Sequence, residues 1–210
     1  MKKFSSTPIA RGTLAGVWVV TAALLFGSTA SRVQAAEGTD ITSNCNECHG
    51  TDGLGFKPSV PHLNGQPDHL LTSMINAFQQ GKRPTKVKMH RDIAAADVAP
   101  LAKHYSLQKA QRPKTATSPE LVARGEALYL KRCADCHVDN GRDSDKEAPL
   151  TAAQDLNYLI EQTLAFKTGQ RKFPFLMDGA YKNLSDEDLT AIAHFFAAQE
   201  QEIPKKRRRR

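Results

Sequence analysis

The chain is built on an internal repeat of 88 residues, and this repeat restricts it to a fold made of two copies of one small unit. The motif Cys45-Asn46-Glu47-Cys48-His49 recurs 88 residues later as Cys133-Ala134-Asp135-Cys136-His137. Met89 and Met177 keep the same separation, and each follows the histidine of its own copy by 40 residues. Self-similarity at a fixed period indicates a duplicated structural unit. Further pairs share the offset: Gly53 and Gly141, Pro61 and Pro149, Gln66 and Gln154, Leu71 and Leu159, Ala77 and Ala165, Phe78 and Phe166, Gly81 and Gly169, Arg83 and Arg171.

Signals for helix ends and apolar faces predict that both copies are helical, so the expected fold class is all-α. Ser118 is expected to cap a helix that has Pro119 in its first turn, and Ser185 with Asp188 forms a capping-box pattern for the final helix. The apolar face of that helix matches the first copy at an offset of 91, which predicts three inserted residues after Met177. The matched positions are Val98, Leu101, Ala102 and Tyr105 in the first copy and Leu189, Ile192, Ala193 and Phe196 in the second.

These features divide the chain into five segments. We expect a signal peptide at 1–35, a first domain at 36–107, a polar, proline-containing linker at 108–118, a second domain at 119–204 and a basic tail at 205–210. Each domain is small and poor in aromatic residues, so its core is marginal without a bound group or a covalent staple.

The first 35 residues carry the features of an export signal. The positively charged start contains Lys2, Lys3 and Arg11, and an apolar run follows at 14–26. Small residues at Val33 and Ala35 then predict cleavage after Ala35. The alternative is an uncleaved membrane anchor, which the shortness of the apolar run disfavours. The expected location of the mature protein is therefore the periplasm.

The formal net charge of +7 is distributed unevenly along the chain. Residues 1–35 carry +4 and residues 205–210 carry +6, which leaves −3 for residues 36–204. A folded body with this charge does not match a nucleic-acid-binding protein, which needs lysines and arginines clustered on a folded face. The tail is either a solvated end or a means of weak association with a membrane surface or an acidic partner.

The two Cys-x-x-Cys-His motifs are the signature of covalent attachment of a c-type haem. On a helix, residues i, i+3 and i+4 share a face, so two sulfurs can bond the haem vinyl groups while the imidazole binds the iron. Two disulfides or a zinc site are weaker alternatives, because neither gives a use to the repeated methionine. The candidate sets are Cys45, Cys48 and His49 in the first copy and Cys133, Cys136 and His137 in the second.

The sixth iron ligand is expected to be a methionine in both copies. Met89 and Met177 are the candidates, and a thioether ligand favours ferrous iron and raises the reduction potential. Met74 is expected to be a core residue, since its counterpart is Gln162. His90 is the rival ligand in the first copy, and its use would lower the potential.

These motifs closely resemble those of the dihaem cytochrome c4 family over nearly all of residues 40–200. The family includes the dihaem subunit of flavocytochrome c sulfide dehydrogenases, which residues 89–91, 133–138 and 143–147 resemble in particular. The resemblance implies two tandem class I cytochrome c domains, each wrapped around one covalently bound haem c. It also implies proximal ligands His49 and His137, distal ligands Met89 and Met177, and carbonyl groups of Pro61 and Pro149 that hold the two imidazoles.

The resemblance leaves two points open. The second copy departs from the family pattern, because Gly50 follows the first motif where a valine follows the second, and Pro61–Gln66 keeps a Pro-x-Leu-x-Gly-Gln pattern that Pro149–Gln154 has lost. The surroundings of the second haem are therefore expected to differ from those of the first. Arg83 and Arg171 are expected either to pair with haem propionates or to be solvated surface residues.

The expected function is electron transfer, because an iron held by histidine and methionine has no open position for a substrate. The protein is then a carrier rather than an enzyme, and it passes electrons between a redox enzyme and a respiratory or photosynthetic acceptor. The expected partners are redox proteins, with the flavoprotein of a sulfide dehydrogenase as one candidate. The alternative is a dihaem peroxidase or sulfur-compound oxidase with one labile axial ligand. A haem-based sensor is a third class, which requires a signalling domain to receive the message.

Overall fold

The chain folds into helices joined by loops. The computed structural model describes residues 41–144, 148–173 and 177–201, and in these ranges the only β-type pairing is an isolated bridge between Arg112 and Gln201. None of the described helices has the length and apolarity needed to span a membrane. The all-α prediction is confirmed, while the predicted signal peptide at 1–35 and basic tail at 205–210 lie outside the described residues.

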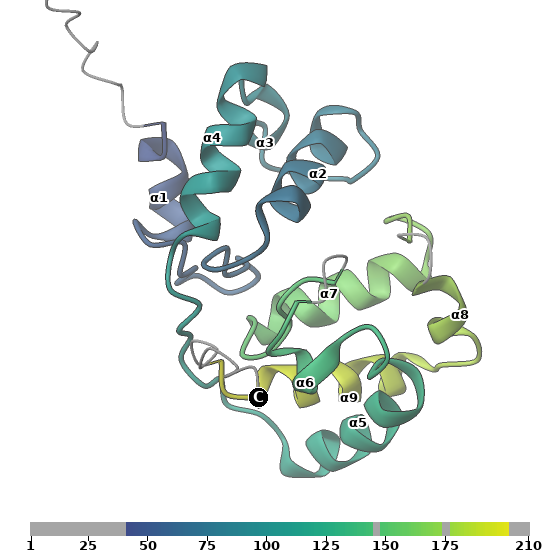
Figure 1. Ribbon diagram of the computed structural model, residues 1–210. Coiled ribbons are helices and arrows are strands. Elements are labelled where there is room, and N and C mark those ends of the chain that lie inside the picture. Colours follow the sequence, from purple (N-terminus) through teal and green to yellow (C-terminus); the bar gives the residue numbers. More distant parts are fainter. Residues whose placement is uncertain (1–40, 145–147, 174–176, 202–210) are drawn as a thin grey trace, which may run out of the picture. The chain divides into compact units, whose positions relative to one another are not determined.

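The helices form two sets, one for each copy (Figure 1). The first set contains α1 (Ser43–His49), α2 (Asp68–Gln79), α3 (Met89–Asp92) and α4 (Ala95–Ser106). The second set contains α5 (Pro119–Arg132), α6 (Val138–Gly141), α7 (Leu156–Lys167), α8 (Met177–Tyr181) and α9 (Asp186–Ala197).

The helices repeat at the spacing that the sequence predicts. Helices α2 and α7 start and end 88 residues apart, and α3 and α8 start 88 residues apart. Helices α4 and α9 start and end 91 residues apart, so the three inserted residues lie between the start of α8 and the start of α9. The duplicated unit is therefore a structural repeat as well as a sequence repeat.

The predicted helix caps are present. The Ser118 hydroxyl accepts a hydrogen bond from the backbone N–H of Leu121 at 3.4 Å, and Pro119 is the first residue of α5. At the start of α9, the Ser185 hydroxyl accepts from the N–H of Asp188 at 3.1 Å, and the Asp188 carboxylate accepts from the N–H of Ser185 at 3.0 Å. Such reciprocal bonds satisfy the backbone donors that a helix start leaves unpaired.

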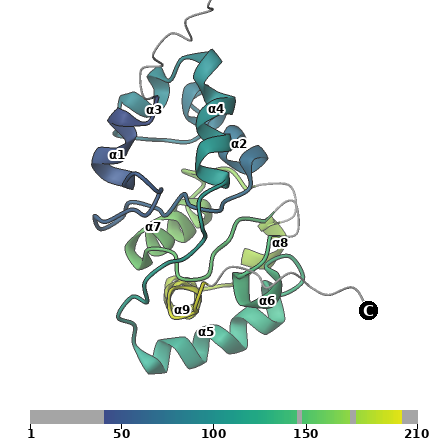
Figure 2. The ribbon, with the colours of Figure 1, turned by 60° about the vertical axis from the view of Figure 1, so that its left-hand side comes forward.

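The core of the second copy is the crossing of α5 and α9 (Figure 2). Gly125 allows this crossing, because a Cβ atom at this position would lie 2.0 Å from the backbone oxygen of Ala191. Next to the crossing, the rings of Tyr129 and Phe195 stack with centroids 4.7 Å apart. Most of the buried apolar side chains of this core come from α9: Leu189, Ile192, Ala193, Phe195, Phe196 and Ala197.

The first copy has a smaller core. Helix α4 packs against α2 and buries Val98, Leu101, Ala102 and Tyr105, whereas α2 has no buried residue. Among the described residues, which begin at Ile41, the first copy has no counterpart of α5. The predicted core positions Tyr105 and Phe196 are both buried.

The two copies are joined by a reciprocal pair of buried glutamine side chains. The side-chain amide of Gln66 accepts from the N–H of Leu150 at 3.0 Å and donates to its carbonyl at 2.8 Å. The side-chain amide of Gln154 accepts from the N–H of His62 at 2.7 Å and donates to its carbonyl at 2.9 Å. Gln66 and Gln154 are 88 residues apart, and so are His62 and Leu150, so the contact follows the repeat. It connects the loops that follow the two Cys-x-x-Cys-His motifs.

Candidate functional site

The first Cys-x-x-Cys-His motif lies on helix α1. Cys45, Cys48 and His49 therefore share one helix face, as the sequence predicts. The imidazole of His49 is buried, and its Nδ1 lies 3.1 Å from the carbonyl oxygen of Pro61. Because a carbonyl oxygen only accepts, Nδ1 donates in this bond, and Nε2 is left available to bind a metal.

Burial also fixes the protonation state of this imidazole. It lowers the pKa of His49 to about 4, although the hydrogen bond to the Pro61 carbonyl opposes the shift. His49 is therefore neutral at pH 7, and the neutral ring is the form that binds a metal.

The second motif has a different local structure, and the expectation that it also lies on a helix is wrong. Helix α5 ends at Arg132, and Cys133 to His137 form turns. Two helix-like bonds remain within the motif, both to the carbonyl of Cys133, from the N–H of His137 at 2.8 Å and from the N–H of Cys136 at 3.2 Å. The hydroxyl of Tyr129, a residue of the α5–α9 core, donates to the carbonyl of His137 at 2.7 Å. The second motif is thus held by the helical core rather than by a helix of its own.

The proline carbonyl of the second copy holds its histidine less closely. Within the described residues, Nδ1 of His137 is buried and has no hydrogen bond of ordinary length. Burial lowers the pKa of His137 to about 4, and the carbonyl of Pro149 opposes this shift, so the carbonyl does face the ring. Both copies therefore present a neutral imidazole, but with different support.

The two candidate methionines occupy equivalent places, at the first residue of α3 and of α8. Met89 is 39% exposed, and Met177 is partly buried. The sequence-predicted residues thus recur at matching positions in both copies. Their role as iron ligands stays a prediction.

His90, the rival ligand, lies close to His49. Its ring centroid is 6.2 Å from that of His49, and its ring stacks on Phe78 at 4.8 Å. Nδ1 of His90 lies 3.2 Å from the hydroxyl of Thr85, and Nε2 is available to a metal in the tautomer in which Nδ1 donates. A centroid separation of this size would allow both imidazoles to hold one metal ion, at about 2 Å per bond. The first copy therefore contains two candidate distal ligands, whereas Asp178 follows Met177 in the second.

Arg83 and Arg171 meet where the two copies face each other, so the alternative in which they are solvated surface residues is wrong. Arg83 is buried and donates to the Tyr158 hydroxyl at 2.9 Å and to the Gln162 side-chain oxygen at 3.1 Å. Arg171 donates to the same Gln162 oxygen at 2.8 Å and contacts the Met74 sulfur at 3.2 Å. Met74 is therefore a half-buried residue of this cluster and not the core residue that was expected.

The electrostatics of this cluster favour an anion. Burial raises the pKa of Tyr158, but the guanidinium groups of Arg83 and Arg171 outweigh it, so the pKa falls below its usual value. The hydrogen-bond acceptors named above for both arginines are uncharged. Two cations that share neutral partners are a suitable place for carboxylates such as haem propionates.

The residues of this chain fit two haem groups. Each copy presents two cysteine thiols, a neutral imidazole fixed at one end and a methionine, and the four cysteines form no disulfide in the described structure. The pair of arginines adds positive charge for the acidic edges of the haems. The same set of thiols, imidazole and thioether occurs in both copies, which is what two equivalent haem sites need.

Comparison with known proteins agrees with a haem-binding chain. Residues 122–199 match the Cytochrome c family. Over 80 residues the chain is 38% identical to Cytochrome c-554(548) of Halomonas halodenitrificans, a match that covers 36% of this chain and 96% of that protein. Over 204 residues it is 28% identical to Cytochrome c4 of Azotobacter vinelandii, which covers 84% of this chain and 96% of that protein.

The fold agrees with the sequence matches. The crystal structure of reduced cytochrome c4 from Pseudomonas stutzeri superposes with a TM-score of 0.65 at 25% identity and covers 76% of this chain and 95% of that one. The chain belongs to the cytochrome c family and is homologous to the dihaem cytochromes c4. As a cytochrome c4 homologue it has two class I cytochrome c domains, carries two haem c groups and transfers electrons rather than catalysing a reaction.

One relative of this cytochrome c4 homologue is named for its partner. The "Thiosulfate dehydrogenase electron acceptor" of Thiomonas intermedia is 29% identical over 171 residues, covering 75% of this chain and 79% of that protein. The expected resemblance to the cytochrome c4 family is therefore confirmed, and redox proteins are the class of partner that these relatives indicate.

Two features of the site were missed at the level of sequence. The repeat identified Gln66 and Gln154 as a pair, but nothing in the pattern indicated that each reaches across to the other copy. Arg112 is buried although it belongs to a linker that reads as polar and solvated. No sequence signal identified it, because the linker has no counterpart in the repeat.

Proposed function

We propose that this protein is exported to the periplasm and transfers electrons there between a sulfur-compound dehydrogenase and a respiratory or photosynthetic acceptor. When bound, each haem supplies a one-electron ferric/ferrous couple. The observation that carries the proposal is the repetition of one complete donor set at two equivalent places. The proposed attachment residues are Cys45, Cys48, Cys133 and Cys136, and the proposed iron ligands are His49, Met89, His137 and Met177.

The chain's own residues hold the two proposed histidine ligands in place. The Pro61 carbonyl orients His49, and the Tyr129 hydroxyl anchors the backbone at His137. A rigid ligand set costs little reorganisation when the iron changes its oxidation state. Arg83 and Arg171 are proposed to bind propionates, which would bring the acidic edges of both haems to the junction of the two copies and shorten the path between them.

The identity of the electron donor is the finer part of the proposal. A relative named for accepting electrons from thiosulfate dehydrogenase favours a donor of that class, whereas the resemblance of residues 133–138 favours the flavoprotein of a sulfide dehydrogenase. Stopped-flow reduction by each enzyme with its own substrate separates the two. We expect fast reduction by one of them, and no reduction by either would reject a sulfur-compound donor.

The central test is the haem content of the purified protein and its reaction with carbon monoxide. We expect two haems per chain by pyridine haemochrome analysis, and little carbon monoxide binding after reduction because both irons have two protein ligands. A colourless protein from a host able to attach haem c would reject the proposed sites. Strong carbon monoxide binding would favour the alternative, a dihaem enzyme with one labile ligand.

A second candidate ligand set for the first haem is His49 with His90. The distance of 6.2 Å between the two ring centroids and the contact of His90 with Thr85 favour it. Histidine ligation on both sides would give the first haem the lower potential of the two. The substitutions that separate Met89 from His90 are given in the Discussion.

A further inference from the structure

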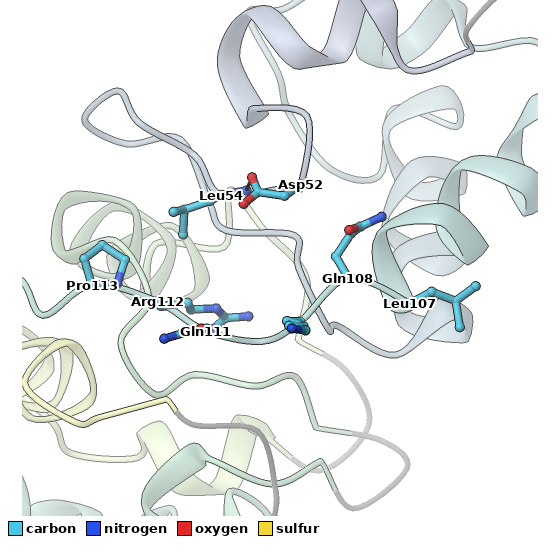
Figure 3. Close-up of a pocket in the computed structure, with 8 residues that line it drawn as sticks. Asp52, Leu54, Leu107, Gln108, Gln111, Arg112 and Pro113 are labelled. Atoms are coloured by element: carbon cyan, nitrogen blue, oxygen red, sulfur yellow. Dashed lines mark hydrogen bonds between the residues drawn. The ribbon is translucent and has the colours of Figure 1, made fainter.

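Arg112 is a buried cation in the segment that connects the two copies. Only 6% of the residue is exposed, and its backbone pairs with Gln201 in the isolated bridge. Figure 3 shows it between Gln111 and Pro113, where the linker passes the loop that carries Asp52 and Leu54. A buried arginine in a linker is unusual, because long charged side chains are rarely buried without a specific partner.

The guanidinium group of Arg112 binds both copies at equivalent residues. Nε donates to the Asn64 side-chain oxygen at 3.1 Å, and Nη2 donates to the Asn64 carbonyl at 3.0 Å. Nη1 donates to the carbonyls of Leu150 and Ala152, both at 3.1 Å. Asn64 and Ala152 are 88 residues apart, and each lies three residues after the proline that faces its histidine. Arg112 therefore contacts both haem-supporting loops, and one residue of each loop is equivalent in the repeat.

In the described ranges Arg112 has no carboxylate within ion-pair distance, although Asp52 lines the same pocket. All four of these acceptors are uncharged oxygens, and no ion pair within the described ranges includes Arg112. Burial lowers the pKa of Arg112 to about 9, so the group remains charged at pH 7. Its field reaches the loop beside it: burial lowers the pKa of His62 to about 4, and the charge of Arg112 acts in the same direction.

We propose that the buried positive charge of Arg112 raises the reduction potentials of both haems together. The inference rests on the proposed haem sites. Ferric haem gains one electron and becomes ferrous, which removes one unit of positive charge, so a fixed nearby cation favours the reduced form. The effect is large when the cation is buried, because the interior has a low effective dielectric constant and salt screens buried charges weakly.

The alternative role for Arg112 is that of a purely structural clamp between the loops. A clamp depends on the fork of hydrogen bonds, whereas a shift of both potentials depends on the charge. Arg112→Lys keeps the charge and loses the fork, and Arg112→Gln loses the charge while it keeps some hydrogen bonding. Arg124→Gln is the matched control, because it removes one exposed positive charge on α5 that pairs with Asp188.

The experiment is a spectroelectrochemical titration of both haems in the holoprotein, at low ionic strength and at 1 M salt (on the order of a 3 Å Debye length). For Arg112→Gln we expect the ferrous-to-ferric ratio of each haem, at a fixed solution potential, to fall about tenfold, which is about 59 mV for a one-electron couple. The shift should persist at high salt. Arg112→Lys should keep both potentials near those of the wild type, and Arg124→Gln should not move them.

Arg112→Lys also provides a test if the glutamine variant does not accumulate as holoprotein. A buried lysine loses its proton at a lower pH than an arginine does, so both potentials of this variant should fall, relative to the wild type, as the pH rises. Unchanged potentials in Arg112→Gln, a shift of one haem only, or equal shifts in the lysine and glutamine variants would overturn the proposal in favour of a clamp. A wild-type protein with fewer than two haems would instead reject the proposed haem sites.

Discussion

The two copies place the same candidate ligands at the same spacing but support them by different means. In the first copy the motif is itself a helix, α1, and the carbonyl of Pro61 holds His49 at 3.1 Å. In the second copy the motif forms turns, and the crossing of α5 and α9 anchors it through Tyr129. The comparison shows that the spacing of the ligands is preserved while the packing around them has diverged.

The two copies also differ in how many residues they bury. The second copy has a continuous core along α9, whereas the first relies on α4 and on hydrogen bonds that cross to the second copy. The match to the Cytochrome c family covers residues 122–199, which is the copy with the larger core. We therefore expect the first copy to depend on the second for its stability more than the second depends on the first.

The largest expected effect is on the iron ligands. Met177→Ala should remove the thioether-to-iron absorption band of one haem, because alanine offers no ligand. Met89→Ala should remove the band of the other haem. Met74→Ala is the matched control, because that methionine contacts Arg171, and its substitution should leave both bands in place. Optical spectra of the oxidised proteins measure the result.

The same spectra, together with carbon monoxide binding, show whether Met89 or His90 is the distal ligand of the first haem. If Met89 is the ligand, His90→Ala leaves the band unchanged, and Met89→Ala increases carbon monoxide binding to the first haem. If His49 and His90 share the iron, His90→Ala changes the spectrum and increases carbon monoxide binding, whereas Met89→Ala has no spectral effect. In that case the two haems differ in their distal ligand as well as in the residues that hold their histidines.

The next effect concerns the core of the second copy. Gly125→Val should destabilise the protein by about 3 kcal/mol, because its side chain would collide with the backbone of Ala191 and separate α5 from α9. Urea unfolding of the holoprotein measures this change. Gly179→Ala is the control, since no atom lies within 4 Å of a Cβ at that position. Equal stability of both variants would contradict the close crossing.

The third effect tests the reciprocal contact between the copies. Gln154→Ala leaves the buried N–H and carbonyl of His62 without these partners, and we expect a loss of about 2 kcal/mol. Gln66→Ala should cost less, because the Leu150 carbonyl keeps its bond from Arg112. Urea unfolding compares the two variants, and a larger loss for Gln66→Ala would contradict this ranking.

The smallest effect concerns one residue of the altered loop in the second copy. Ala153 has a φ of 48°, in the left-handed region, where its equivalent Gly65 has a φ of 68°. Ala153→Gly should stabilise the protein by less than about 1 kcal/mol, since relief of the strain is partly offset by the greater freedom of glycine in the unfolded chain. Ala152→Gly, at a neighbouring and equally buried position, should destabilise it. Thermal unfolding distinguishes the variants, and an equal loss in both would contradict strain at Ala153.

Much of the fold could be predicted from the sequence because its signals are local. The caps at Ser118 and Ser185 depend on residues within one turn, and the offset of 91 between α4 and α9 follows from two apolar faces. The expectation of a helix at Cys133–His137 was wrong because α5 ends at Arg132, before the motif. Met74 was misplaced because its partner, Arg171, is 97 residues away in the sequence.

The sequence by itself determined the duplication and the chemistry of the candidate sites, because both reside in residue types at fixed separations along one covalent chain. Only the tertiary structure decided how the copies are joined, which places Arg83, Arg171 and Arg112 at their junction instead of in solvent. The physical reason is that burial and uncompensated charge depend on groups brought together by folding. A linker arginine has the same sequence pattern whether it is solvated or enclosed between two loops.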